Sequence, residues 1–224
     1  MRFHLNGENI QELEYMSISV GLFDLDLSEL NVYELNALTG ILGLIGKSNE
    51  VLLTDSGLYK LIESKPSTRV YTTKAYNILD SLCSKINKNE EIIIINRNEE
   101  KKIVSIKFNS SFFEDSIIAY KKDITLDTQL FKSLDSTAQK LFYLMLQAEI
   151  FSGAFYTNAD SLVSTLGLKD RYSVYRLIKH SIKLLREHFE ELDYERTKNE
   201  DIVYLNFKFI PGSVRCVTHT RSRI

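Results

Sequence analysis

The sequence contains no tryptophan and only two cysteines, two prolines and nine glycines among its 224 residues. Cys83 and Cys216 lie far apart, form no CxxC pair and have no histidine cluster beside them, which argues against both a zinc site and a disulfide framework. Two such cysteines fit a reducing compartment, so we expect a cytoplasmic protein. The scarcity of proline and glycine leaves no low-complexity linker.

Long apolar runs and catalytic signatures are also missing. Residues 1–11 are too polar for a signal peptide, and the longest apolar stretch, Ala37–Ile45, is too short to span a bilayer. The sequence has no P-loop, no GxGxxG after a strand, no HExxH and no GxSxG. We therefore expect a protein that is not an enzyme and that has no catalytic residues, no cofactor, no metal site and no membrane partner.

Charge is divided unevenly along the chain, although the net charge is only −2. Residues 1–115 hold 12 Lys and Arg against 17 Asp and Glu, whereas residues 116–224 hold 16 against 13. The first part is therefore acidic and the second part is basic. A polyanion is expected to bind mainly to the second part.

The sequence predicts the same order of helices and strands in each half of the chain. The first half begins with a predicted strand at residues 15–25. It continues with a helix within residues 30–46, a strand at 50–53, a helix capped by Thr54, a helix over about Arg69–Ile86, and a hairpin with its tip at Arg97–Lys101. The second half has a helix opened by Ser133 or Asp135, an extended piece at Phe155 and Tyr156, a helix capped by Thr157 or Asn158 and ended by Gly167, a long helix opened by Asp170, and a hairpin with its tip at Thr197–Glu200.

Helix, short strand, short helix, long helix and hairpin is the order of a winged helix, a helix-turn-helix with a β-hairpin attached. The sequence thus predicts an α+β protein with two tandem winged-helix domains. The expected divisions are an N-terminal domain at 1–115, a C-terminal domain at 122–210, and a basic tail at 211–224 that carries Arg215, Arg221 and Arg223. An unrelated α+β domain with the same order of elements is the alternative.

The long helix of the second half is the predicted DNA-reading helix. At about 100° per residue, its core face gathers Val174, Leu177, Ile178, Ile182, Leu185 and Phe189. The opposite face gathers Tyr172, Arg176, Lys179, His180 and Lys183 without an acidic residue. The alternative is that this face is simply the solvated side of an amphipathic helix.

Each residue type on this face suggests a contact. Arg176 is suited to a bidentate contact with guanine, and Lys179 and Lys183 to guanine or phosphate. Tyr172 and Ser173 lie early in the helix, where hydroxyl groups meet the DNA backbone, and the helix N-terminus itself favours a phosphate.

The predicted wing of the second half adds two cations. Arg196 and Lys198 lie at the hairpin tip, where cations usually touch phosphate or the minor groove. Lys and Asn at a hairpin tip also increase solubility, so a role of these two cations in solubility alone is the alternative.

The corresponding helix of the first half is less basic. Its polar face holds Thr73, Asn77, Asp80 and Ser84, and the carboxylate of Asp80 repels phosphate. We expect this domain to be a weaker DNA reader or a protein–protein interface. The strand at 91–97, EIIIINR, is suited to pairing with another chain or to burial within its own domain.

Three stretches of the second half carry a resemblance: LFKSLDSTAQKLFYLMLQ, FYTNADSLVSTLGLKDRYSVYRLIKHSIKLL and DIVYLNFKF. Together they resemble the C-terminal winged helix of plasmid replication initiators. The resemblance implies two winged helices in tandem, of which the C-terminal one reads repeated origin sites. It also implies that the N-terminal one mediates dimerisation and contacts the DNA backbone.

The expected function is therefore sequence-specific binding of duplex DNA by a replication-initiator-like homodimer. Host replication proteins are further candidate partners. A transcriptional regulator on the same scaffold and a winged-helix assembly module that binds only protein remain the alternatives.

Overall fold

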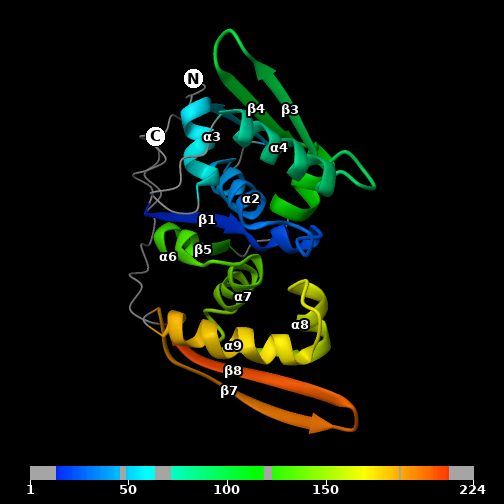
Figure 1. The fold of residues 1–224 in the computed structure, drawn as a ribbon, viewed down its shortest axis with the longest axis vertical. Coiled ribbons are helices and arrows are strands. Elements are labelled where there is room, and N and C mark those ends of the chain that lie inside the picture. The colour runs from blue at the N-terminus through cyan, green and yellow to red at the C-terminus, as the bar shows by residue number, and fades with distance from the viewer. Residues whose placement is uncertain (1–13, 46–48, 64–71, 119–122, 187, 212–224) are drawn as a thin grey trace. The chain divides into compact units, whose positions relative to one another are not determined.

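The computed structural model describes residues 14–45, 49–63, 72–118, 123–186 and 188–211. The protein is α+β, and its described strands form small antiparallel sheets (Figure 1). The chain forms two compact units, residues 1–148 and 149–224, which are described separately below.

The first unit opens with a strand that pairs far along the chain. β1 (Tyr15–Ser19) runs antiparallel to β5 (Asp123–Asp127). β1 is shorter than the strand predicted at 15–25, because the Ser19 hydroxyl accepts a bond from the Gly21 N–H and starts the 3-10 turn η1 (Val20–Asp24). Sequence analysis did not predict β5 or the helix after it, α6 (Thr128–Ser133).

Six elements of the first unit follow the predicted order. We call them the first motif: α2 (Val32–Ile45), β2 (Glu50–Thr54), α3 (Asp55–Ile62), α4 (Thr72–Ile86), β3 (Ile93–Asn98) and β4 (Ile103–Phe108). The predicted cap at Thr54 is confirmed, since its hydroxyl accepts from the Gly57 N–H at 3.2 Å. The predicted start of the third helix near Arg69 lies outside the described residues. The strand order β2-β4-β3 leaves β3 at a sheet edge.

A short helix, α5 (Ser110–Phe112), runs into the π-helical turn η2 (Phe113–Ile118), and α6 is followed by α7 (Thr137–Ala148). α7 begins after the predicted Ser133 or Asp135, because Ser136 and Gln139 form a capping box, each accepting from the other's N–H at 3.2 Å. The division into units falls after Ala148, not at the predicted 115–122. The physical reason is that β5 pairs with β1, and α7 packs on β5.

The second unit repeats the later part of this order. It contains β6 (Ala154–Asn158), α8 (Ala159–Thr165), α9 (Arg171–Leu185), β7 (Phe189–Asn199) and β8 (Ile202–Pro211). Asn158 caps α8 by accepting from the Ser161 N–H at 2.7 Å, and Gly167 ends that helical segment at a φ of 59°. We call α7 together with these five elements the second motif.

The two motifs agree in more than the order of their elements. The strand order β6-β8-β7 matches β2-β4-β3, so in both sheets the second hairpin strand lies in the middle. α2 starts with a capping box of Asn31 and Glu34, as α7 does with Ser136 and Gln139. α4 and α9 each contain 15 residues. The repeat expected from the sequence is therefore present in the structure at the level of helices and strands.

The inner faces of the two sheets differ in the kind of side chain they bury. In the second unit Phe155 and Tyr194 both stack on Phe207, with ring centroids 5.7 and 5.6 Å apart. Val51, Ile106 and Ile95 occupy the corresponding register positions in the first unit. The second hairpin is thus anchored by aromatic packing and the first by aliphatic packing.

Candidate nucleic-acid interface

The start of α9 is set by a carboxylate. Asp170 accepts from the N–H and from the hydroxyl of Ser173, at 2.7 and 2.8 Å, and these bonds hold the pKa of Asp170 below its ordinary value. The predicted opening at Asp170 is confirmed. This carboxylate already occupies the helix N-terminus and the Ser173 hydroxyl, which differs from the phosphate contact expected there.

The remainder of α9 is amphipathic. Val174, Ile178, Ile182 and Leu185 are buried as predicted, while Leu177 is half-buried. The helix ends at Leu185, so buried Phe189 belongs to β7 and not to the helix. The predicted opposite face is exposed throughout: Tyr172, Arg176, Lys179, His180 and Lys183.

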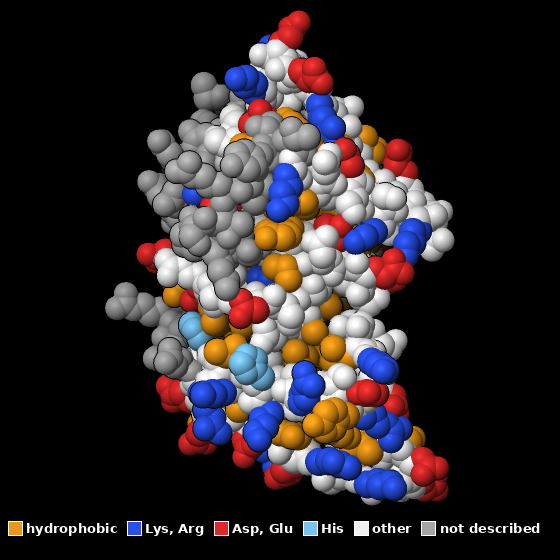
Figure 2. Space-filling view, viewed as in Figure 1, with side chains coloured by type: hydrophobic (Ala, Val, Ile, Leu, Met, Phe, Trp, Pro, Cys, Tyr) orange, Lys and Arg blue, Asp and Glu red, His pale blue; other side chains and the backbone are white. Residues whose placement is uncertain are grey.

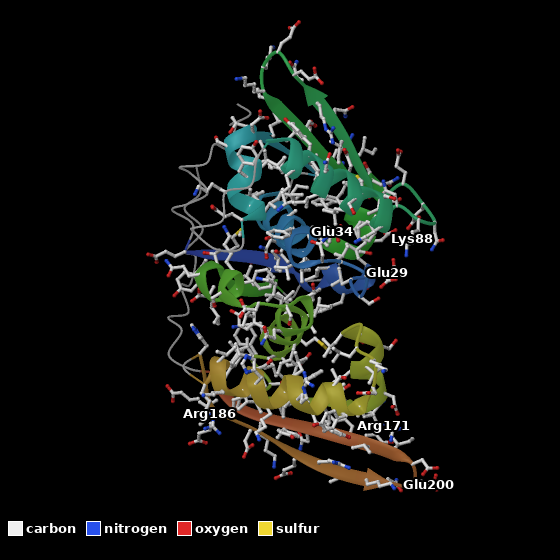
Figure 3. The ribbon with its side chains drawn as sticks, viewed as in Figure 1. Glu29, Glu34, Lys88, Arg171, Arg186 and Glu200 are labelled. Carbon is white, nitrogen blue, oxygen red and sulfur yellow. The ribbon has the colours of Figure 1, made fainter. Side chains whose placement is uncertain are left out.

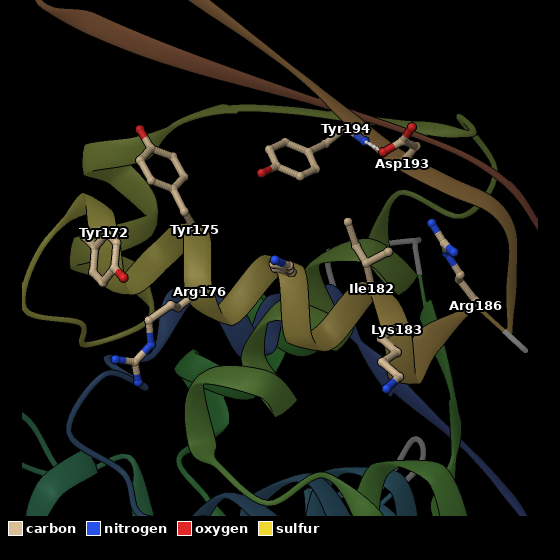
Figure 4. Close-up of a pocket in the computed structure, with 9 residues that line it drawn as sticks. Tyr172, Tyr175, Arg176, Ile182, Lys183, Arg186, Asp193 and Tyr194 are labelled. Carbon is tan, nitrogen blue, oxygen red and sulfur yellow. Dashed lines mark hydrogen bonds between the residues drawn. The ribbon is translucent and has the colours of Figure 1, made fainter.

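A groove of about 640 Å³ lies between this helix and β7 (Figure 4). Four cations line it: Arg176, Lys179, Lys183 and Arg186. Its other lining side chains are Tyr172, Tyr175, Tyr194, Ile182 and Asp193. In Figure 4, Tyr175 and Tyr194 lie in the space between helix and hairpin, whereas Arg176 and Lys183 project from α9 away from the hairpin.

The groove is positively charged. Among the described residues that line it, Asp193 is the one acidic side chain, and this carboxylate accepts from the backbone N–H of Tyr194 at 2.8 Å. None of the four lining cations forms an ion pair with another described residue. Figure 2 shows Lys and Arg side chains gathered over the region of α9 and β7. The groove therefore offers unpaired positive charge beside aromatic rings.

The neighbouring ion pairs lie outside the groove. Arg171 binds Asp160 of α8 through its Nε at 2.6 Å, and Lys208 binds Glu195 at 3.0 Å. Figure 3 places Arg171 and Arg186 at opposite ends of α9, and Glu200 at the tip of the second hairpin. Asp160 and Glu195 are thus engaged in ion pairs outside the groove, whereas Asp193, Glu190 and Glu191 lie near Arg186 at its C-terminal end.

An irregularity in β7 brings the strand to the groove. The pairing of β7 with β8 shifts between Glu190 and Asp193, and Glu191 has a φ of 55°, in the left-handed region. Such a bulge twists a strand and re-aims the side chains that follow it. Tyr194 thereby packs on the inner side of the sheet, against Phe207 at 5.6 Å.

Four of the predicted DNA-binding residues line the groove: Tyr172, Arg176, Lys179 and Lys183. His180 is exposed on α9 but does not line it. On β7, the Arg196 guanidinium carbon lies 4.8 Å from the centre of the Tyr175 ring. Lys198 is exposed nearer the hairpin tip, opposite Val203.

Sequence analysis missed Tyr175, Arg186 and Tyr194 as lining residues. Tyr175 and Arg186 carry a signal that could have found them, because each lies three residues from another member of the row, Tyr172 and Lys183 respectively. Tyr194 carries none, since its place depends on the bulge.

The corresponding face of α4 is neutral. Asn77, Asp80 and Ser84 are exposed as predicted, and the side chain of Thr73 lies outside the described residues. Arg97 of β3 forms an ion pair with Asp80 and covers the Tyr76 ring at 4.5 Å. The first unit therefore holds an arginine at its hairpin, but a carboxylate neutralises it.

Two kinds of site are not found among the described residues. No three His, Cys, Asp or Glu side chains in the described ranges are grouped so that they could hold a metal ion. Likewise, no helix in the part of the chain that the structure describes is long and apolar enough to cross a membrane. In comparisons with known proteins, no family model and no curated protein matches the sequence.

Proposed function

We propose that this protein binds duplex DNA sequence-specifically through α9 and the hairpin β7–β8, as a replication initiator with two winged-helix motifs does. The repeated order of elements and the matching strand orders support the winged-helix reading of both motifs. α9 takes the place of the recognition helix, and the hairpin takes the place of the wing. The resemblance of the second half to plasmid replication initiators supports repeated origin sites as the target.

The row of cations along α9, none of which pairs with another residue that the structure describes, is the observation that carries the proposal. DNA-binding affinity depends largely on cations that neutralise phosphates, and specificity depends on side chains that reach base edges. Arg176, Lys179, Lys183 and Arg186 provide both kinds of group on one face of one helix. The major groove is wide enough to admit an α-helix, so these side chains can meet bases and both flanking backbones.

The roles follow from position on the helix. Arg176 lies in the N-terminal half of α9, the half that leads into the groove, and its planar fork suits guanine. Lys183 and Arg186 lie near the end of α9 and are assigned to phosphate. Tyr172, which is 68% exposed, places its hydroxyl at the start of the same face.

The first unit is assigned to dimerisation. β3 lies at the edge of its sheet, and its residues Ile94 and Ile95 are only half-buried. An open edge with apolar side chains is suited to pairing with a second copy of the chain. The neutral face of α4 supports an auxiliary role for this unit on DNA, and host replication proteins remain proposed partners.

A binding titration of the full chain on duplex DNA at several salt concentrations tests the function. With about three phosphate contacts per bound second unit, log K is expected to fall with log salt with a slope of roughly −3. Lys107→Ala is the control, because Lys107 is an exposed cation of the first unit and its loss should leave the slope unchanged. A wild-type slope near zero would overturn the proposal and favour a protein-assembly module.

A further inference from the structure

Both units carry the same contact between the 15-residue helix and the hairpin. In the first unit Arg97 covers the ring of Tyr76 at 4.5 Å, and in the second Arg196 covers the ring of Tyr175 at 4.8 Å. Each tyrosine is the fifth residue of its helix, and each arginine comes from the first strand of its hairpin. We call this contact the clasp.

In the first unit, two carboxylates close the clasp. Asp80, one turn after Tyr76, pairs with the Arg97 guanidinium, and this bond raises the pKa of Arg97 above its ordinary value. Asp55 accepts from the Tyr76 hydroxyl at 2.5 Å. Burial, together with that bond, raises the pKa of Tyr76 to about 12. The positive charge of this clasp is therefore compensated within the unit.

In the second unit, neither carboxylate is present. Because α4 and α9 have the same length, Lys179 stands where the first unit has Asp80. Ala159, the first residue of α8, stands where the first unit has Asp55, the first residue of α3. The Tyr175 hydroxyl oxygen is shielded from solvent and bonds to no described residue. Arg196 likewise forms no ion pair within the described part of the chain.

The difference changes what the clasp arginine can bind. A ring below the guanidinium attracts its charge but leaves its N–H groups at the edge free, whereas a carboxylate takes up both the charge and those donors. Arg196 is thus held over the ring of Tyr175 with its donors available, and Tyr175 lines the groove together with Lys179. Arg97 is held in place with its donors engaged by Asp80.

We propose that the residue one turn after the clasp tyrosine determines whether the clasp arginine binds a DNA phosphate. Asp80 withholds Arg97 from phosphate in the first unit, and Lys179 leaves Arg196 available to it in the second. The inference rests on the proposed function, because it names the residues that assign DNA binding to one unit and withhold it from the other.

A double-mutant cycle on the full chain tests the second clasp, with a random-sequence duplex as the probe. Arg196→Ala alone is expected to weaken binding about tenfold or more and to flatten the salt slope by about 0.9, the loss of one charge-assisted contact to phosphate. In a Lys179→Ala background the same loss should persist. In a Lys179→Asp background, Arg196→Ala should have no further effect, because the new carboxylate has already taken the guanidinium.

The reciprocal test is a gain of binding in the first unit. Asp80→Asn should steepen the salt slope by about 0.9, and adding Arg97→Ala should remove the gain. Asp115→Asn, an exposed site with the same change in net charge, is the matched control and should give no gain. Equal slopes for Asp80→Asn and Asp115→Asn would overturn the assignment of Asp80.

The outcomes separate the inference from the function on which it rests. Salt-dependent binding by the wild type, with an equal cost of Arg196→Ala in the Lys179→Ala and Lys179→Asp backgrounds, overturns the inference and leaves the function standing. A wild type without salt-dependent binding overturns both. Unfolding midpoints in urea confirm that each variant is folded, and Lys179→Glu replaces Lys179→Asp if that variant unfolds.

Discussion

Helices α4 and α9 are the same length and belong to motifs whose sheets have the same strand order, but their exposed faces differ in charge. Position by position, Arg176, Lys179, Lys183 and Arg186 of the second unit correspond to Asn77, Asp80, Ser84 and Asn87 of the first. The hairpins follow the same rule, since Lys198 corresponds to Glu99. The four cations along the groove and Lys198 thus have neutral or acidic counterparts, whereas Arg196 corresponds to another arginine, Arg97.

The pattern of buried residues is shared by α4 and α9, whereas the charge of their exposed positions differs. The apolar faces correspond, with Ala75, Ile78 and Leu79 matching Val174, Leu177 and Ile178. A shared pattern of buried residues accounts for the shared order of helices and strands. Exposed positions carry little of the folding free energy, so their charge can differ without disturbing the fold.

The largest expected effect concerns the different packing of the two sheets. Phe207 is fully buried between two aromatic rings, so Phe207→Ala should destabilise the second unit by about 3–5 kcal/mol through lost packing and a residual cavity. Ile106→Ala, at the same position of the first sheet, should destabilise the first unit by about 2–5 kcal/mol. Amide hydrogen exchange measures the two units separately.

Tyr156→Ala is the control for the aromatic substitution. Tyr156 stacks on Tyr204 at 5.5 Å but is 63% exposed, so its loss should cost no more than about 1 kcal/mol. A cost equal to that of Phe207→Ala would show that the outer face of the sheet is as important as the inner face.

The next effect concerns base reading. Arg176→Ala should weaken specific binding by roughly 1–3 kcal/mol and relax sequence preference at one base pair, because one bidentate contact is lost. Asn77→Ala, its counterpart on α4, should leave affinity and preference unchanged. Competition titrations against a set of single-base variants measure both quantities. Wild-type affinity in folded Arg176→Ala would remove this residue from the reading face.

Helices α2 and α7 each bury one ionisable side chain, Glu34 and Lys140, and the two differ in which charged partners surround them. Burial raises the pKa of Glu34, but bonds from Lys85, Ser81 and the Asn31 N–H outweigh it and hold that pKa below its ordinary value. Lys140 of α7 is fully buried and donates to the backbone carbonyl of Phe131. Its Nζ atom lies 4.2 Å from the centre of the Phe131 ring. Burial first, and Lys132 second, lower the pKa of Lys140 from 10.5 to about 7.

The sign of the resulting pH dependence follows from proton counts. Between pH 7 and 10.5 the folded state holds Lys140 neutral while the unfolded state binds the proton, so stability rises with pH. From pH 7 to 8.5 the expected gain is up to about 2 kcal/mol, measured by urea unfolding. Lys140→Met should abolish the gain, and Lys107→Met should keep it.

A second buried group, the thiol of Cys83, has the opposite effect on stability at higher pH. Burial raises the pKa of the Cys83 thiol to about 11, and such a shift makes stability fall with pH once the unfolded thiol ionises. Below pH 8.5 this opposing effect is small. A stability that falls between pH 7 and 8.5 in the wild type would contradict the role of Lys140.

The smallest expected effect concerns the wing tips. Lys198→Ala should flatten the salt slope by about one unit without changing sequence preference, because a wing cation contacts the backbone. Glu99→Ala, at the corresponding tip of the first hairpin, should leave the slope unchanged or steepen it slightly. A change in sequence preference with Lys198→Ala would instead place this lysine in a groove.

Features encoded in a few neighbouring residues could be predicted from the sequence. Thr54 and Asp170 cap their helices as expected, because a side chain that accepts an N–H two or three residues ahead acts locally. The row from Tyr172 to Lys183 was also predictable, since helical periodicity alone puts those residues on one face. Four of its members line the groove.

Features that depend on distant partners could not be predicted. β5 is a five-residue strand whose pairing partner, β1, lies near the start of the chain, and short strands without a hairpin have no local signal. The division into compact units after Ala148 depends on the same distant pairing. Tyr194 reaches the groove only because Glu191 adopts a left-handed backbone conformation, which its residue type does not suggest.

The pairing of β1 with β5 also governs how the protein is made. Tyr15 meets Asp127 only after the ribosome has synthesised everything between them, so the two-stranded sheet of β1 and β5 cannot be completed early in translation. Closing so long a loop before any contact compensates for the lost entropy slows folding, whereas the hairpin β7–β8 closes within a few residues. The chain emerging from the ribosome therefore exposes β1 as an unpaired edge for several seconds, at about 5–20 residues per second. A chain truncated after residue 115 would keep that edge permanently, and we expect it to aggregate.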